Sequence, residues 1–210
     1  MDVLKKIKKI KVQTEETLQD AFSLVREIED RGEVLKWCQW IRREAKKIPT
    51  ASMYELTYKT YLLAAMRGDF DSYCIYLEKN REGEKRFYLP RRDVLLPLVR
   101  DLQDLFDGKL DFLGISLPPR VGKSTLCIFF MTFVMGHRPA VASVMSGHSD
   151  KLTDGFYREI LSIITDNTQY LWSDVFPGVN IADNSAKNET VDLRRKRGFR
   201  QLLAVPFRVH

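Results

Sequence analysis

One stretch of the chain carries residues whose types and spacing could bind phosphate. It runs from Phe112 to Leu126 and reads FLGISLPPRVGKSTL, so an apolar segment leads into a short turn that ends in Gly-Lys-Ser-Thr. Backbone N–H groups at the start of a helix, together with the positive end of the helix dipole, favour an anion. Lys123 can reach the terminal phosphates of a nucleotide, and the Ser124 hydroxyl can ligate Mg²⁺. The sequence therefore predicts a nucleotide site, with ATP and Mg²⁺ as its ligands.

The turn itself is expected to supply the binding residues, which are Pro119, Arg120, Val121, Gly122, Lys123, Ser124 and Thr125. The strict pattern has a glycine where this chain has Leu117, and two prolines stiffen the turn where glycine usually gives freedom. The context supports the match, because an apolar strand pattern precedes the turn and an apolar helix pattern follows it. The alternative is an ordinary strand–helix turn that happens to carry Gly-Lys-Ser-Thr.

Hydrophobic periodicity predicts a helical first part of the chain. Four apolar stripes at helical spacing run through residues 14–80, with Gly32, Pro49 and Gly68 as the expected breaks between them. Such stripes must pack on each other or on a neighbour. We therefore expect a helical N-terminal subdomain over residues 1–80.

The second part shows a different pattern. A helix pattern over 92–105 is followed by an apolar strand at 112–117, the turn, a helix over 123–135, a second strand at 141–145 and a further helix from residue 150. This β-α-β-α order predicts an α/β fold with a parallel sheet of the P-loop NTPase type. Residues 87–210 are expected to form a partial P-loop ATPase domain, in which this sheet is incomplete.

Composition permits nucleic-acid contact without requiring it. The net charge of the 210 residues is +6 and the pI is near 9.2. The best candidates for contact with DNA phosphates are four consecutive cations, Arg194, Arg195, Lys196 and Arg197. The alternative explanations of this cluster are a solvated hairpin and a tail disordered by truncation. The three cysteines show no metal or disulfide spacing, and no segment is as long and apolar as a membrane span, so we expect a cytoplasmic protein.

Three segments together resemble the large terminase subunit of tailed bacteriophages. They are Phe87-Tyr-Leu-Pro-Arg-Arg92, Leu117-Pro-Pro-Arg-Val-Gly-Lys-Ser-Thr125 and Tyr170-Leu-Trp-Ser-Asp-Val-Phe-Pro177. The resemblance implies an ATP-driven motor that packages double-stranded DNA in the cytoplasm of a bacterial host, encoded by a phage or prophage. It also implies a small terminase subunit and a portal as partners, an oligomer only in the assembled motor, no membrane, and a separate nuclease domain.

The resemblance also assigns roles to individual residues. Lys123 would hold the β- and γ-phosphates, Ser124 would bind Mg²⁺, and Arg120 would sense or stabilise the γ-phosphate. Lys123 and Arg120 are accordingly the predicted catalytic residues. Tyr88, Arg91 and Arg92 correspond to the region that contacts the adenine end of the nucleotide in that family. An ordinary helix start with surface charges explains these three residues equally well.

The chain departs from that family after the turn. Phosphoryl transfer needs an acidic residue at the end of a neighbouring strand, and no apolar run ends in an acidic pair; Thr190-Val-Asp-Leu193 is too short. Leu203-Ala-Val-Pro206 also departs from the family, which suggests a truncated or frameshifted terminase with weak or no turnover. The alternative is a stand-alone nucleotide-binding or partner-docking module without ATPase activity.

Overall fold

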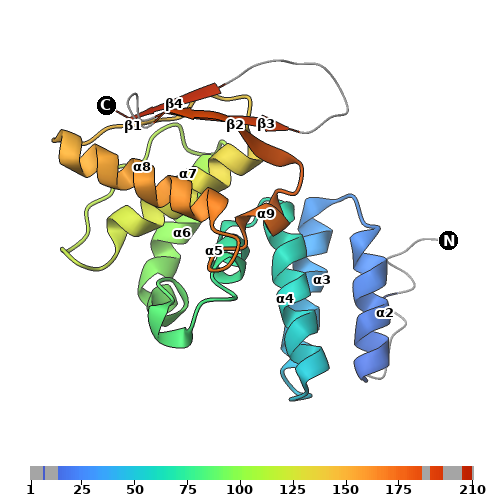
Figure 1. Ribbon diagram of the computed structural model, residues 1–210. Coiled ribbons are helices and arrows are strands. Elements are labelled where there is room, and N and C mark those ends of the chain that lie inside the picture. Colours follow the sequence, from blue (N-terminus) through green and yellow to red (C-terminus); the bar gives the residue numbers. More distant parts are fainter. Residues whose placement is uncertain (1–6, 8–13, 186–189, 196–204, 210) are drawn as a thin grey trace. The chain divides into compact units, whose positions relative to one another are not determined.

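The computed structural model describes residues 7, 14–185, 190–195 and 205–209 (Figure 1). The chain divides into two compact units, an N-terminal unit of Met1–Tyr76 and a C-terminal unit of Leu77–His210. The N-terminal unit is helical in its described part. The C-terminal unit combines helices with a small sheet. Within the described residues, no helix has the length and apolar character needed to cross a membrane.

Four helices follow one another from the N-terminal side: α2 (Glu15–Arg26), α3 (Arg31–Ala45), α4 (Ala51–Met66) and α5 (Phe70–Leu77). The four helical segments predicted from periodicity are confirmed. The expected stop at Gly32 is wrong, because α2 already ends at Arg26 and Gly32 lies in the first turn of α3. The cause is Asp30, whose side chain accepts a hydrogen bond from the Glu33 backbone N–H and so starts α3 before the glycine.

Helices α2, α3 and α4 pack on one another around a continuous apolar core (Figure 1). Each contributes a stripe at helical spacing, as in Leu18, Ala21 and Val25 on α2. Two arginines tie the helix ends together, since Arg31 donates to the Gly68 carbonyl at 2.9 Å and Arg67 donates to the Ile28 carbonyl at 3.1 Å. These contacts make the N-terminal unit a helical array with its own core.

The helices of the C-terminal unit are α6 (Arg92–Phe106), α7 (Lys123–His137), α8 (Asp150–Thr165) and the short α9 (Trp172–Val175), with 3₁₀ turns at Gly83–Lys85 and Leu89–Arg91. The predicted helices at 92–105 and 123–135 are confirmed. An indole hydrogen bond fixes α9 against α7, because Trp172 Nε1 donates to the Thr132 carbonyl at 3.0 Å. Trp172 and Thr132 are both almost fully buried, so this contact lies in the core of the unit.

The strands of the C-terminal unit are β1 (Val144–Met145), β2 (Val179–Ser185), β3 (Thr190–Arg195) and β4 (Val205–Val209), in the order β1-β4-β3-β2. Strands β2 and β3 pair antiparallel, with Ile181 opposite Leu193 and a bulge after Ile181. Strand β4 pairs antiparallel with β3 and parallel with β1. Figure 1 shows α7 and α8 on one side of this sheet.

The predicted α/β fold with a P-loop NTPase-type parallel sheet is therefore wrong. The described chain is mainly helical, its strand pairing is mostly antiparallel, and the segment 112–117 is not a strand. The alternating apolar residues of that segment favour a β-strand. A strand forms only when a neighbouring strand pairs with it, and none of the described residues pairs with this segment. Its first side chain, Phe112, is 85% exposed, which also rules out the buried centre of a parallel sheet.

The predicted second strand at 141–145 is reduced to two residues, Val144 and Met145. Val141 is outside the strand and 54% exposed, and Val144 is 61% exposed. An apolar run of this length fits a buried strand only if helices cover both faces. The exposure of both valines shows that this covering is missing here.

Candidate phosphate-binding turn

The turn before α7 has an unusual backbone. Gly122 has a φ of +98°, and Arg120, two residues earlier, has a φ of +67°. Among the described residues other than glycine, Arg120 alone has a positive φ. Left-handed conformations that alternate with right-handed ones turn successive backbone N–H groups toward one side, which creates a concave anion-binding surface. The left-handed conformations of Arg120 and Gly122 are therefore compatible with such a surface.

The same turn is open to solvent. Pro118, Pro119, Arg120, Lys123 and Ser124 are all exposed. Helix α7 starts at Lys123 without a hydrogen bond from any capping side chain of the described chain. The first N–H groups of a helix have no partner inside the helix, so here they remain available to an outside acceptor.

The rest of α7 is anchored in the core. Its buried residues lie on several faces of the helix and include Leu126, Ile128, Phe129, Phe133 and Met135. Fully burying one such side chain stabilises the fold by about 1.5–3 kcal/mol. The apolar helix pattern seen in the sequence thus corresponds to a buried helix, and this burial fixes the position of the turn at its start.

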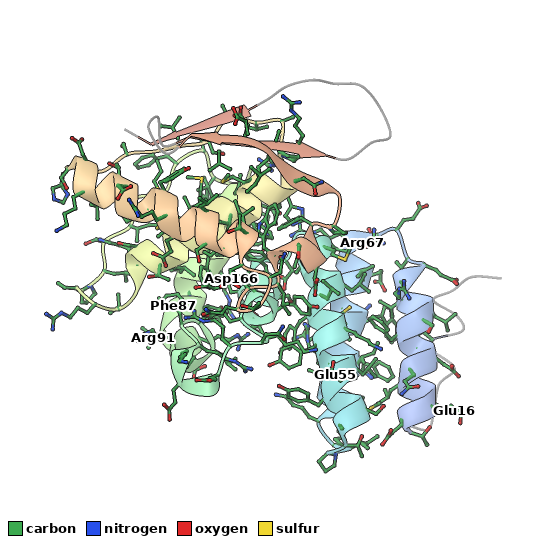
Figure 2. All side chains as sticks on the ribbon, in the orientation of Figure 1. Glu16, Glu55, Arg67, Phe87, Arg91 and Asp166 are labelled. Atoms are coloured by element: carbon green, nitrogen blue, oxygen red, sulfur yellow. The ribbon has the colours of Figure 1, made fainter. Side chains whose placement is uncertain are left out.

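An aromatic side chain packs directly on the glycine of the turn. A Cβ placed on Gly122 would lie 2.3 Å from a ring carbon of Phe87, so only glycine fits between ring and backbone. The same ring meets Phe129 of α7 edge to face, with 5.5 Å between centroids. The Arg91 guanidinium lies 5.4 Å from the centroid of the same ring, and Figure 2 labels both residues. Phe87 therefore forms one wall of the turn.

A buried carboxylate holds Phe87 in this place. Glu78 is 2% exposed, and its oxygens accept hydrogen bonds from the backbone N–H groups of Phe87, at 2.9 and 3.0 Å, and Tyr88, at 2.8 Å. Arg81 Nη1 donates to the same carboxylate at 2.7 Å. These charge-assisted bonds compensate the burial of Glu78 and fix the backbone that carries the Phe87 ring.

The guanidinium of Arg81 links this carboxylate to α8 and the segment after it. It donates to the Tyr170 hydroxyl at 3.1 Å and lies 5.0 Å from the centroid of that ring. Burial raises the pKa of the Glu159 carboxyl, and the charge of Arg81 partly opposes this rise. Burial also raises the pKa of Tyr170, so the phenol stays neutral at ordinary pH. The network is a structural support of the turn rather than a set of exposed reactive groups.

The other predicted residues are spread over the unit. Tyr88 is fully buried, whereas Arg91 is exposed. Arg194 is exposed on β3, and Arg195 ends that strand. Lys196 and Arg197 lie outside the described residues, so the predicted DNA-binding cluster is described only in its first half.

The turn carries some, but not all, of the groups that bind a nucleotide with Mg²⁺. An exposed ammonium group, an exposed hydroxyl and the helix N-terminus suit phosphate oxygens and one metal-ligand bond. Within the described residues, no three His, Cys, Asp or Glu side chains are grouped so as to hold a metal ion. Asp192, set aside above because its apolar run is too short, does lie in strand β3, and its Oδ1 is buried without a hydrogen-bond partner.

Sequence reasoning found the turn but missed its supports. The segment that begins at Phe87 carries part of the resemblance to terminases, but that resemblance implies no structural role for Phe87 and none for Glu78. A signal existed for Glu78, because it follows the apolar run Ile75-Tyr-Leu77 and a carboxylate there must be buried with a partner. For Phe87 no signal existed, since its contact with Gly122 joins residues 35 positions apart.

No family model, curated protein or solved structure matches this chain. The resemblance to the terminase large subunit therefore stays a prediction that rests on the three sequence segments.

Proposed function

We propose that the turn of residues 118–125 binds the phosphates of ATP with Mg²⁺, and that the chain is the ATP-binding part of a DNA-packaging terminase large subunit. The observation that carries the proposal is the pair of left-handed residues, Arg120 and Gly122, directly before an uncapped and exposed helix start. The proposal does not depend on a parallel sheet. It depends on backbone N–H groups, the helix dipole and one ammonium group.

Each residue of the turn has a defined part in this proposal. Lys123 would bind the terminal phosphates, Ser124 would be a ligand to Mg²⁺, and Gly122 would supply the left-handed backbone of the turn, beside the ring of Phe87. Arg120 projects from an exposed position of the turn, where a guanidinium can pair with phosphate oxygens. Mg²⁺ would neutralise phosphate charge during transfer of the γ-phosphoryl group.

Thermal unfolding with and without Mg²⁺-ATP tests the proposal. A ligand at 100 times its Kd stabilises the folded state by about 2.7 kcal/mol, which corresponds to a rise in Tm of several degrees for a chain of this size. We expect this rise in the wild type and its loss in Lys123→Ala. The matched control is Lys151→Ala, since Lys151 is also an exposed lysine at the start of a helix, α8.

Two results would contradict the proposal. One is a wild-type Tm that ATP leaves unchanged, which would mean that the turn does not bind the nucleotide. The other is an equal rise in Lys123→Ala and in the wild type, which would place ATP elsewhere on the chain. Phosphate release measured on the same samples separates binding from turnover.

A further inference from the structure

We propose that a groove between α2 and α4 is the docking site for an acidic amphipathic helix of a partner protein. The groove lies wholly in the N-terminal unit and has a volume of about 420 Å³. Its apolar lining consists of Phe22, Leu56, Leu62, Leu63 and Met66. This inference is independent of nucleotide binding, because the turn belongs to the other unit.

The shape of the groove suits a helix. Near the starts of the two helices, Gln19 of α2 donates a hydrogen bond to Ser52 Oγ of α4 at 2.9 Å. At the ends of the same helices, Arg26 of α2 and Met66 of α4 both line the groove. The two helices therefore run in the same direction. From Leu56 to Met66 the α4 side of the groove is about 15 Å long, or about three helical turns. A helix laid along it would place apolar residues at i, i+3 and i+7 over the floor.

The packing of the unit leaves room for such a helix. Helices α2, α3 and α4 form an array in which α3 contacts both neighbours extensively and α2 contacts α4 less. A helix laid between α2 and α4 would cover the apolar side chains of the groove, in the way that helices of a bundle cover one another's apolar stripes. Met66 is 44% exposed at the end of the groove, and a partner would bury it.

The positively charged side chains that line the groove favour an acidic partner. Arg26 and Lys59 both line the groove, and none of the Asp or Glu side chains that the structure describes does. Both cations are exposed, and within the described part of the chain neither forms an ion pair. An occupant with carboxylates beside its apolar face would pair with them, whereas a basic occupant would be repelled.

The charge argument also disfavours the chain's own N-terminal segment as the occupant of the groove, although Ile7 of that segment is buried in the core of the same unit. The first eleven residues carry lysines at positions 5, 6, 8, 9 and 11 and a single acidic residue, Asp2. Such a segment would bring positive charge to the positively charged lining of the groove. The groove therefore favours an acidic helix from another molecule.

Two fluorescein-labelled peptides test the proposal on the full chain. Both are 18-residue amphipathic helices with the same leucines on one face, and the positions beside that face are all Glu in one peptide and all Lys in the other. By fluorescence anisotropy we expect the Glu peptide to bind at least about tenfold more tightly than the Lys peptide, with the difference shrinking at high salt. Lys59→Glu should weaken binding of the Glu peptide about five- to tenfold.

The matched control is Lys46→Glu, because Lys46 is an exposed lysine of the same unit that does not line the groove. It should leave both affinities unchanged. No binding of the Glu peptide, no preference between the peptides, or equal loss in both variants would overturn the proposal. Two further results would overturn the proposal. One is a concentration-dependent dimer that Lys59→Glu abolishes, because a second copy of the chain would then occupy the groove. The other is binding to phosphatidylserine vesicles that Lys59→Glu abolishes, because a membrane would then occupy it.

Discussion

The helices of the N-terminal unit and helix α7 of the C-terminal unit start in different ways. Thr14, Asp30 and Thr50 precede α2, α3 and α4, and each side chain accepts a hydrogen bond from the helix backbone. Before α7 stands a glycine with a positive φ and no capping side chain from the described residues. A capped start satisfies its own N–H groups, whereas the α7 start leaves them for another acceptor.

The absence of a cap does not by itself distinguish α7. Helix α8 also starts without a side-chain cap, although Ser149 stands at the right position. What distinguishes α7 is the pair of left-handed residues and the support from outside the turn, where Glu78 holds Phe87 against Gly122. The comparison teaches that a strained, open helix start persists where buried contacts elsewhere hold it.

Removing the buried negative charge of Glu78 should release Phe87 from Gly122, and we expect the largest loss of stability from this change. Glu78→Gln leaves Arg81 without its buried counter-ion and weakens two backbone hydrogen bonds, so we expect the free energy of unfolding to fall by about 3–5 kcal/mol. Urea denaturation measures it. The control is Glu82→Gln, because Glu82 is 75% exposed and its pair with Lys85 should contribute less than about 1 kcal/mol. Similar losses in both variants would show that Glu78 does not support the turn.

A smaller but still large effect is expected at the glycine itself. Gly122→Ala places a methyl group 2.3 Å from a carbon of the Phe87 ring and forces alanine into a left-handed conformation. Strain and displacement of the ring together should cost about 2–3 kcal/mol. Chemical denaturation checks this loss. Gly155→Ala is the control, since a Cβ there meets nothing within 4 Å and alanine favours helix α8 by up to about 1 kcal/mol.

Local patterns predicted the helices well, because each helix buries a stripe that is visible in the sequence. The stripe of Leu18, Ala21 and Val25 is one example, and the Asp30 side chain that starts α3 is a local signal as well. The turn at Gly122 was also predictable, since its residue types are adjacent in the chain. These features depend on interactions within a few residues, which is what periodicity and capping rules describe.

The sheet could not be predicted in the same way. The segment 112–117 has a strand pattern and no strand partner among the described residues, while β2 and β3 form a hairpin that periodicity did not indicate. Strand pairing is decided by distant partners, so an apolar run alone does not show whether a strand forms. The contacts of Phe87 with Gly122 and Glu78 are missed for the same reason, because they are tertiary.

The smallest expected change in stability comes from substitutions at the N-cap positions, and it should differ between a capped and an uncapped helix start. In the N-terminal unit, Asp30 accepts from the Glu33 N–H at 2.8 Å, so Asp30→Ala should lower the free energy of unfolding by about 1 kcal/mol. Ser149→Ala at the start of α8 removes no such bond and should change it by no more than a few tenths of a kcal/mol. Hydrogen exchange locates the change, because the Glu33 amide should exchange faster in Asp30→Ala, while the first turn of α8 keeps its rate in Ser149→Ala. Equal destabilisation by both substitutions would show that the Asp30 hydrogen bond does not stabilise the start of α3 more than the open start of α8 is stabilised by Ser149.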